Sequence, residues 1–279
     1  MHPDLELAFH RLVEDLKNDQ RCHGGWHYGS VGRGTQDRYS DFDPVFLVSD
    51  QHFEAFSADI PRFLTQVADE LLILWPEGFN DAHCKNFCSV IRLGEGLHQL
   101  DFFVLNSDFP ETWMGRQHLK DCGRDQILFD RTGKVGALLD RGLRTDHDLP
   151  DPIRACDTYW FHLQMLIKYF KRKDLFKIIK NLDVLFHAHV DLLLSHHDRI
   201  DWGGWESKVR HGVPYQGQEH LKLYFAPADL WHLEEAVRSA VPGFRADAER
   251  ILGEQGKRYR WAVADQIEAS FLKRMDEVE

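Results

Sequence analysis

Two aspartates separated by one residue come just before an apolar run in the first third of the chain. Asp41 and Asp43 precede Pro44-Val45-Phe46-Leu47-Val48, which has the composition of a buried strand. Because side chains alternate faces along an extended chain, both carboxylates should project from one side and Phe42 from the other, into the core. Adjacent carboxylates repel each other unless a cation lies between them, and Mg²⁺ is the usual hard cation in such a place. The pair therefore predicts a metal site.

A segment rich in small residues lies shortly before the two aspartates, Tyr28-Gly29-Ser30-Val31-Gly32-Arg33-Gly34. We expect a strand, a tight loop and a second strand here. Gly29 would let the backbone pass close to phosphates, and the Ser30 hydroxyl could donate to phosphate oxygens. Arg33 could pair with a phosphate, or could be an exposed arginine beside Asp37. The segment and the aspartates together predict a metal-phosphate site.

A third aspartate, Asp101, interrupts the apolar run 99–105. Burying an unpaired carboxylate is costly, so its neighbours must solvate it or it must face a cleft and hold a cation. The presence of Asp41 and Asp43 favours the second alternative.

The order of these three pieces resembles the signature of the nucleotidyltransferase superfamily, which has the polymerase-beta-like fold: Gly29-Ser30, then Asp41-x-Asp43, then Leu100-Asp101-Phe102. The pattern Gly-Ser-x-x-x-Gly-x-x-x-x-Tyr-Ser-Asp-x-Asp is similar to that of small antibiotic nucleotidyltransferases, which adenylylate lincosamides or aminoglycosides. The resemblance covers residues 26–105.

This resemblance implies a reaction and a set of ligands. A nucleoside monophosphate, AMP from ATP, would pass to a hydroxyl of a small molecule and pyrophosphate would leave, with two Mg²⁺ ions as cofactors. Asp41 and Asp43 would bind both ions, and Asp101 would hold the ion near the acceptor. Whether Asp101 or a carboxylate of the helical half takes the acceptor proton stays open.

The second half of the chain should supply further contacts. Lys168 and Lys171 lie three residues apart on one predicted helix face, where they could contact the triphosphate or form a solvated basic face. Asp157 and Asp183 are candidates for an acceptor-binding or base role. Several large or ionisable side chains are less specific: Trp160 is expected in the core, Trp202 and Trp205 could offer stacking surface, and His187, His189, His196 and His197 are interpreted as surface or core polar residues.

Composition limits the classes of partner. The 279 residues carry a formal net charge of −11, which argues against a protein that binds nucleic acid through its phosphates. The charge suits a small cationic substrate, but it can equally serve solubility alone. No signal peptide or membrane-spanning run is visible, and five scattered cysteines fit a reducing cytoplasm. Cys84, Cys88 and His83 have no matching second half for a zinc site. Whether the chain forms an oligomer stays open.

The periodicity predicts an α+β chain. We expect a nucleotidyltransferase catalytic domain, residues 1–145, with a mixed sheet, and a helical bundle domain, residues 152–279, joined by a polar segment rich in proline. Gly24-Gly25 should separate a first helix from the motif. Helices are predicted over 5–16, 61–75, 134–143, 153–173, 174–197, 228–240, 242–252 and 258–275, and strands over 26–28, 44–48, 87–93, 99–105 and 127–129, with a turn at Gly94-Glu95-Gly96.

Two other functions stay open at this stage. The acceptor could be a protein side chain or an RNA end, although the acidic charge weighs against RNA. The chain could also be a nucleotide-binding or antitoxin-like protein without turnover, because a fold alone does not settle function. All three aspartates are present, which disfavours that second alternative.

Overall fold

The computed structural model describes residues 2–111, 123–141, 149–196 and 204–277. The chain divides into two compact units, Met1–Asp146 and His147–Glu279, each with its own hydrophobic core. Part of the polar segment that was predicted to join two domains lies outside the described residues.

The first unit contains a six-stranded sheet in the order β3 (Glu70–Pro76), β4 (Cys84–Leu93), β5 (Gly96–Asn106), β2 (Pro44–Val48), β1 (Cys22–His27), β6 (Ile127–Asp130). Strands β2 and β5 are parallel, whereas the other neighbours are antiparallel. The sheet is therefore mixed, and the predicted α+β class is confirmed.

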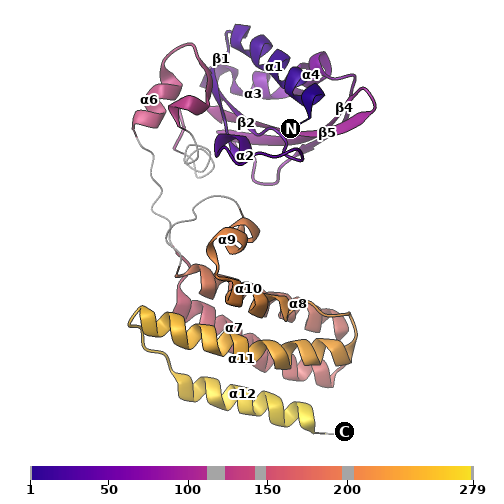
Figure 1. Ribbon diagram of the computed structural model, residues 1–279, viewed down its shortest axis with the longest axis vertical. Coiled ribbons are helices and arrows are strands. Elements are labelled where there is room, and N and C mark those ends of the chain that lie inside the picture. The colour runs from indigo at the N-terminus through magenta and orange to yellow at the C-terminus, as the bar shows by residue number, and fades with distance from the viewer. Residues whose placement is uncertain (1, 112–122, 142–148, 197–203, 278–279) are drawn as a thin grey trace. The chain divides into compact units, whose positions relative to one another are not determined.

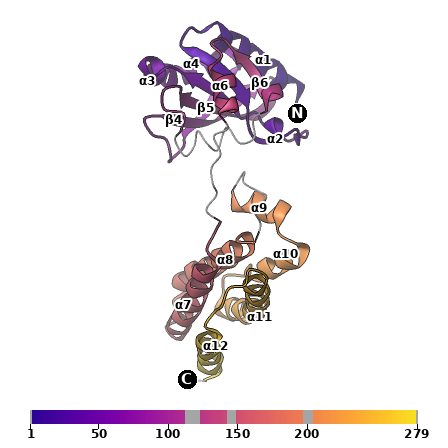
Figure 2. The same ribbon diagram turned by 90° about the vertical axis from the view of Figure 1, so that its left-hand side faces the viewer.

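Helices cover both faces of this sheet (Figures 1 and 2). On one face lie α1 (Pro3–Asn18), α3 (Phe53–Ala58) and α4 (Ile60–Val67), whose apolar side chains share a core with those of the strands. On the other face lies α6 (Lys134–Asp140), whose Val135 and Leu138 pack with Trp26, Val45 and Phe103. Alternation along β2 and β5 thus sends successive side chains into two different cores.

Two predictions in this unit are wrong. Gly24 and Gly25 do not break the chain but lie inside β1, where a Cβ on Gly24 would approach the Phe129 carbonyl to 2.7 Å and one on Gly25 the Phe46 ring to 2.7 Å. The predicted helix 61–75 ends at Val67, and residues 70–76 instead form β3. Hydrogen bonding to β4 decides the state of this second segment, because a short apolar run fits either a helix or a strand.

The hairpin prediction is confirmed with a correction to its turn. Strands β4 and β5 pair along their whole length, and Leu93 opposes Gly96. The turn is therefore the two residues Gly94-Glu95, with Gly94 at a φ of +59°, rather than three residues. The length of the turn sets the register of the hairpin, and this register places Cys88 of β4 opposite Asp101.

The second unit is helical, with α7 (Pro152–Lys171), α8 (Leu175–Leu194), α9 (Trp205–Gly212), α10 (Tyr215–Lys222), α11 (Leu230–Glu254) and α12 (Trp261–Asp276). Helix α7 packs against α8, α11 and α12. At the centre the Tyr159 ring stacks on that of Phe244 with centroids 3.5 Å apart, beside the buried Trp160. Trp160 is thus a core residue, as expected.

The proline at position 242 does not separate two helices. Helix α11 runs through Pro242, whereas the sequence predicted helices 228–240 and 242–252. The buried side chains of Val237 and Phe244 continue one apolar stripe across the proline. Burial of this stripe compensates for the backbone hydrogen bond that proline removes.

No helix in the described part of the chain is long and apolar enough to cross a membrane.

Candidate active site

The three aspartates meet at the centre of the sheet, where β2 and β5 run side by side. The parallel register pairs Val45 with Phe103, and an isolated bridge pairs Phe42 with Leu100. The same register puts Asp43 beside Asp101 on the neighbouring chain segment. Both aspartates therefore project from the face that carries Val45 and Phe103.

Phe42 fixes the direction of its two neighbours. Its side chain is 5% exposed, and its ring stacks on Phe9 of α1 with centroids 3.9 Å apart. Its carbonyl accepts a hydrogen bond of 2.9 Å from the Asp101 amide. Because Phe42 points into the core of α1, Asp41 and Asp43 point to the opposite side, as the alternation predicted.

The carboxylates are half-buried and perturb one another. Burial and then the charges of Asp41 and Asp101 raise the pKa of Asp43, the charge of Arg33 lowers it, and the net result is a pKa of about 7. Burial also raises the pKa values of Asp41 and Asp101. A group of carboxyls with raised pKa values is stabilised by a cation that neutralises them.

The donor set fits Mg²⁺, which prefers hard oxygen ligands. The oxygens of the three carboxylates do not all lie within 4.8 Å of one another, so they do not converge on a single point. Binding of two ions, which in two-metal sites lie about 3.5–4 Å apart, stays a prediction.

The glycine-rich segment, residues 28–34, lies beside the aspartates. The predicted loop contains a one-turn helix, α2 (Gly29–Gly32), and Gly29 has a φ of +65°. The Tyr28 amide donates to the Asp43 carbonyl at 3.1 Å, so this turn is held against the aspartate segment. The Ser30 hydroxyl is buried and has no hydrogen-bond partner among the described residues. A buried hydroxyl of this kind is available to an oxygen ligand such as a phosphate.

A second turn leads from this segment to the aspartates. The Asp37 carboxylate accepts hydrogen bonds from the Tyr39 amide, at 2.8 Å, and from the Ser40 hydroxyl, at 3.2 Å. The Ser40 hydroxyl also accepts from the Asp37 amide at 2.8 Å. Ser40 therefore caps the turn, and the Asp37 carboxylate accepts its hydrogen bonds from within the same turn.

Three residues next to Asp101 were missed by the sequence interpretation. The Cys88 thiol lies 3.4 Å from Asp101 Oδ2 and 3.3 Å from Glu77 Oε1, and the Gln99 amide donates to Asp101 Oδ1 at 3.1 Å. Burial, followed by the charge of Asp101, raises the pKa of the Cys88 thiol, which stays protonated and donates. Cys88 opposes Asp101 in the hairpin, so the two-residue turn was the signal that could have identified it.

The predicted nucleotide lysines lie in the second unit. Lys168 lies over the Tyr169 ring, with Nζ 4.9 Å from its centroid, and Lys171 donates to the Glu277 carbonyl at 2.7 Å. Both are in the last turn of α7, where positive charge also stabilises the helix end. Their contact with a triphosphate stays a prediction.

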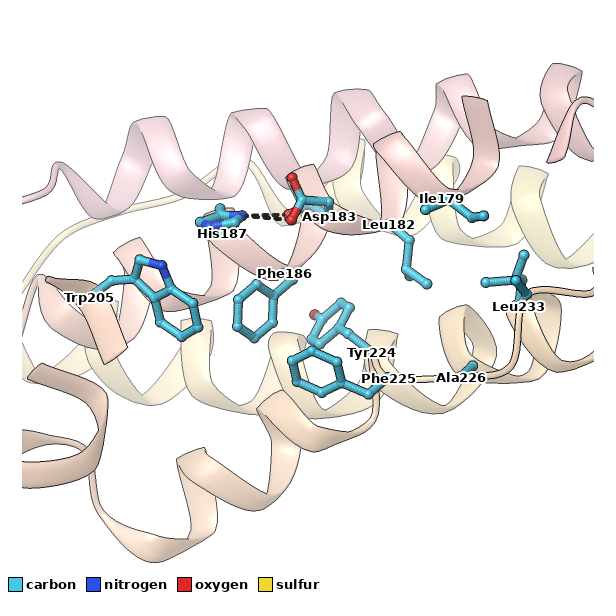
Figure 3. Close-up of a pocket in the computed structure, with 11 residues that line it drawn as sticks. Ile179, Leu182, Asp183, Phe186, His187, Trp205, Tyr224, Phe225, Ala226 and Leu233 are labelled. Atoms are coloured by element: carbon cyan, nitrogen blue, oxygen red, sulfur yellow. Dashed lines mark hydrogen bonds and ion pairs between the residues drawn. The ribbon is translucent and has the colours of Figure 1, made fainter. Parts of the chain in front are cut away.

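The two acidic candidates of the second unit differ in their surroundings. Asp157 accepts hydrogen bonds from the Tyr259 hydroxyl, at 2.9 Å, and from Arg260, at 2.8 Å, so it joins α7 to the segment before α12. Asp183 lies at the surface with His187 and lines a hollow together with Trp205 (Figure 3). Trp202 and His197 lie outside the described residues.

The described histidines of this unit are surface or core polar residues, as expected: His187 and His196 are partly exposed, and His189 is buried. Asp247 Oδ2 lies 3.1 Å from His189 Nε2 and 2.7 Å from His220 Nδ1, and the Tyr224 hydroxyl lies 3.0 Å from His189 Nδ1. A ring nitrogen of His189, a ring nitrogen of His220 and a carboxylate oxygen of Asp247 are close enough to one another to hold a metal ion. They also satisfy one another by hydrogen bonding, and Arg250 contacts the other oxygen of Asp247, so we interpret the group as a buried polar network.

Comparisons with known proteins give limited information. No family model and no curated protein matches the chain. A solved structure of an aminoglycoside 6-adenyltransferase from Bacillus subtilis is similar, with 12% sequence identity and a TM-score of 0.46, and the comparison covers 99% of this chain and 100% of that one. Because this similarity is low, function is inferred from the residues of the site.

Proposed function

We propose that the chain is a Mg²⁺-dependent nucleotidyltransferase that moves a nucleoside monophosphate, AMP from ATP, to a hydroxyl of a small molecule. The observation that carries this proposal is the register of β2 and β5, which puts Asp43 beside Asp101 on one face, with Asp41 close to both. The motif order of the sequence supports the same reaction.

In this reaction the acceptor hydroxyl oxygen forms a bond to the α-phosphorus of the triphosphate. The bond between that phosphorus and the bridging oxygen breaks, pyrophosphate leaves, and the acceptor proton passes to a base. Mg²⁺ would supply activation of the acceptor and neutralisation of the triphosphate. Positioning and charge therefore carry the catalysis.

The chain's own residues divide this work. Asp41 and Asp43 would hold both ions, and Asp101 would hold the one nearest the acceptor. Gly29 lets the backbone of the turn lie directly against Asp43, and the buried Ser30 hydroxyl and the Arg33 charge would contact the triphosphate oxygens. Lys168 and Lys171 are proposed as further triphosphate contacts from the second unit.

The acceptor is proposed to be a small, hydroxyl-bearing and cationic molecule, such as a lincosamide or an aminoglycoside. The net charge of −11 supports a cationic substrate and disfavours nucleic acid.

The test is pyrophosphate release from ATP and Mg²⁺ by the full chain, measured with a panel of lincosamides, aminoglycosides and simple amino alcohols. We expect release that depends on the acceptor and disappears in Asp41→Asn and Asp43→Asn. Glu95→Gln, in the exposed hairpin turn, is the matched control and should retain activity. Activity that survives both aspartate substitutions would refute the site.

A further inference from the structure

Two hollows in the helical unit share Asp183 and His187. The first has a volume of about 390 Å³ and is lined by Phe186, Trp205, Tyr224 and Phe225 among others. The second, of about 670 Å³, is lined by Asp183, His187, Asp151, Asp191 and Arg154 among others. A volume in this range suits a small organic ligand.

The first hollow is aromatic and open. The Phe186 ring meets those of Trp205, Tyr224 and Phe225 at centroid distances of 5.0, 5.9 and 5.3 Å (Figure 3). Phe225 is 71% exposed and Trp205 is 37% exposed, so these rings are accessible from solvent. Exposed aromatic rings bind flat apolar groups by stacking and cations by their π-faces.

The second hollow is acidic. Three carboxylates, those of Asp151, Asp183 and Asp191, line it together with the single cation of Arg154. Asp183 Oδ1 lies 3.2 Å from His187 Nδ1, and the side chains of Asp183 and His187 are 65% and 45% exposed. The carboxylate of Asp183 is therefore available beside the aromatic hollow, where it can attract a positive group.

We propose that these two hollows form a binding site for an amphipathic amine, with its apolar ring among the aromatic side chains and its ammonium group at Asp183. The inference rests on the proposed function in one respect, since it narrows the proposed acceptor to hydroxyl-bearing amines that also carry an apolar group and excludes purely polar polycations such as aminoglycosides. A purely polar polycation would leave the aromatic hollow without a partner, and a neutral ring would leave the carboxylates without one.

The test is isothermal titration of the full chain without nucleotide or Mg²⁺, using three probes. Tryptamine has both an aromatic ring and an ammonium group, tryptophol replaces the amine with a hydroxyl, and spermidine is a polyamine without a ring. We expect tryptamine to bind about fivefold more tightly than either of the other two. Equal affinities for tryptamine and tryptophol, or tighter binding of spermidine, would overturn the proposal.

Substitutions locate the site. Phe225→Ala should weaken tryptamine binding about tenfold, and Asp183→Asn, which removes the charge and leaves the backbone carbonyl that accepts from His187, about threefold. Phe176→Ala, at a residue of α8 that is 81% exposed and does not line the hollow, and Glu235→Gln, on α11, are the controls and should bind as the unmodified chain does. Unchanged binding by Phe225→Ala would refute the site.

Failure of this inference can be told apart from failure of the proposed function. Asp41→Asn should abolish pyrophosphate release while tryptamine still binds. Tryptamine binding without any transfer activity would refute the proposed reaction only, whereas transfer without tryptamine binding would refute the amine site only.

Discussion

The backbone of Gly29 lies against the carboxylate of Asp43, because a Cβ built on Gly29 would come within 2.0 Å of Asp43 Oδ2. No side chain fits between the turn at Gly29 and this carboxylate. The contact joins the turn that we propose binds phosphate to the carboxylates that we propose bind metal, so a change in one displaces the other.

Gly29→Ala should therefore reduce pyrophosphate release by about 100-fold, since displacement of a site group by about 1 Å costs that much. The matched control is Gly34→Ala. Gly34 has a φ of +67°, close to the +65° of Gly29, but a Cβ there meets no atom within 4 Å. Both variants carry the backbone strain and only the first carries the clash, so equal activities would contradict this explanation.

Asp43→Asn should abolish activity and yet stabilise the metal-free chain. The substitution removes a half-buried charge that burial and the neighbouring Asp41 and Asp101 disfavour. We expect a rise in melting temperature of about 2–4 °C, which corresponds to about 1 kcal/mol in a chain of this kind. Differential scanning calorimetry in a chelating buffer measures the change, and a fall in melting temperature would contradict the electrostatic account.

The stability of the metal-free chain should fall as the pH rises. Asp43 has a folded-state pKa of about 7, above its ordinary value of 3.8, so its contribution is fully present below about pH 4 and is lost as the pH rises through 7. Urea midpoints measured from pH 4 to pH 8 without metal should show this decline. In Asp43→Asn the decline should be shallower, and parallel curves for the two proteins would exclude Asp43 as its source.

Cys88 should act as a positioning residue for Asp101. Loss of its thiol in Cys88→Ala removes one hydrogen bond from a weak S–H donor and should lower kcat about fivefold with little change in KM. Cys88→Ser keeps a donor at the same place and should recover most of the loss. If alanine and serine are equally active, the thiol does not orient the carboxylate.

Asp247 should stabilise the helical unit. Burial alone would raise the pKa of Asp247, but the hydrogen bonds from His189 and His220 outweigh burial and hold the pKa at about 2. Asp247→Ala leaves both histidines without this acceptor and should cost about 3–5 kcal/mol of unfolding free energy. Urea unfolding followed by circular dichroism measures the cost, with Glu235→Gln as the control, and a loss below about 1 kcal/mol would show that the network contributes little.

Local sequence patterns were sufficient to predict how the three aspartates are oriented and which strand carries Asp101. Alternation along an extended chain placed Asp41 and Asp43 on one side and Phe42 in the core, and the apolar run around Asp101 identified its strand. The roles of these aspartates as metal ligands stay predictions, because the geometry shows their proximity and not their ligands.

Features that depend on pairing between distant segments could not be predicted in the same way. A three-residue turn at Gly94 shifts the hairpin register by one residue and hides the contact of Cys88 with Asp101. Residues 70–76 carry apolar side chains that suit a helix equally well, and only the hydrogen bonds to β4 select a strand. The hollow around Phe186 is formed by side chains from α8, α9 and the segment after α10, which no local periodicity brings together.

The raised pKa of Asp43 would couple the binding of a metal ion at this carboxyl to the release of a proton. Because the pKa of this carboxyl is raised to about 7, a divalent cation that binds there would compete with a proton near neutral pH. Metal loading would then release protons to the medium, so its apparent enthalpy would change with the ionisation enthalpy of the buffer. The occupancy of the site could thus be followed by proton release alone, before any nucleotide is added.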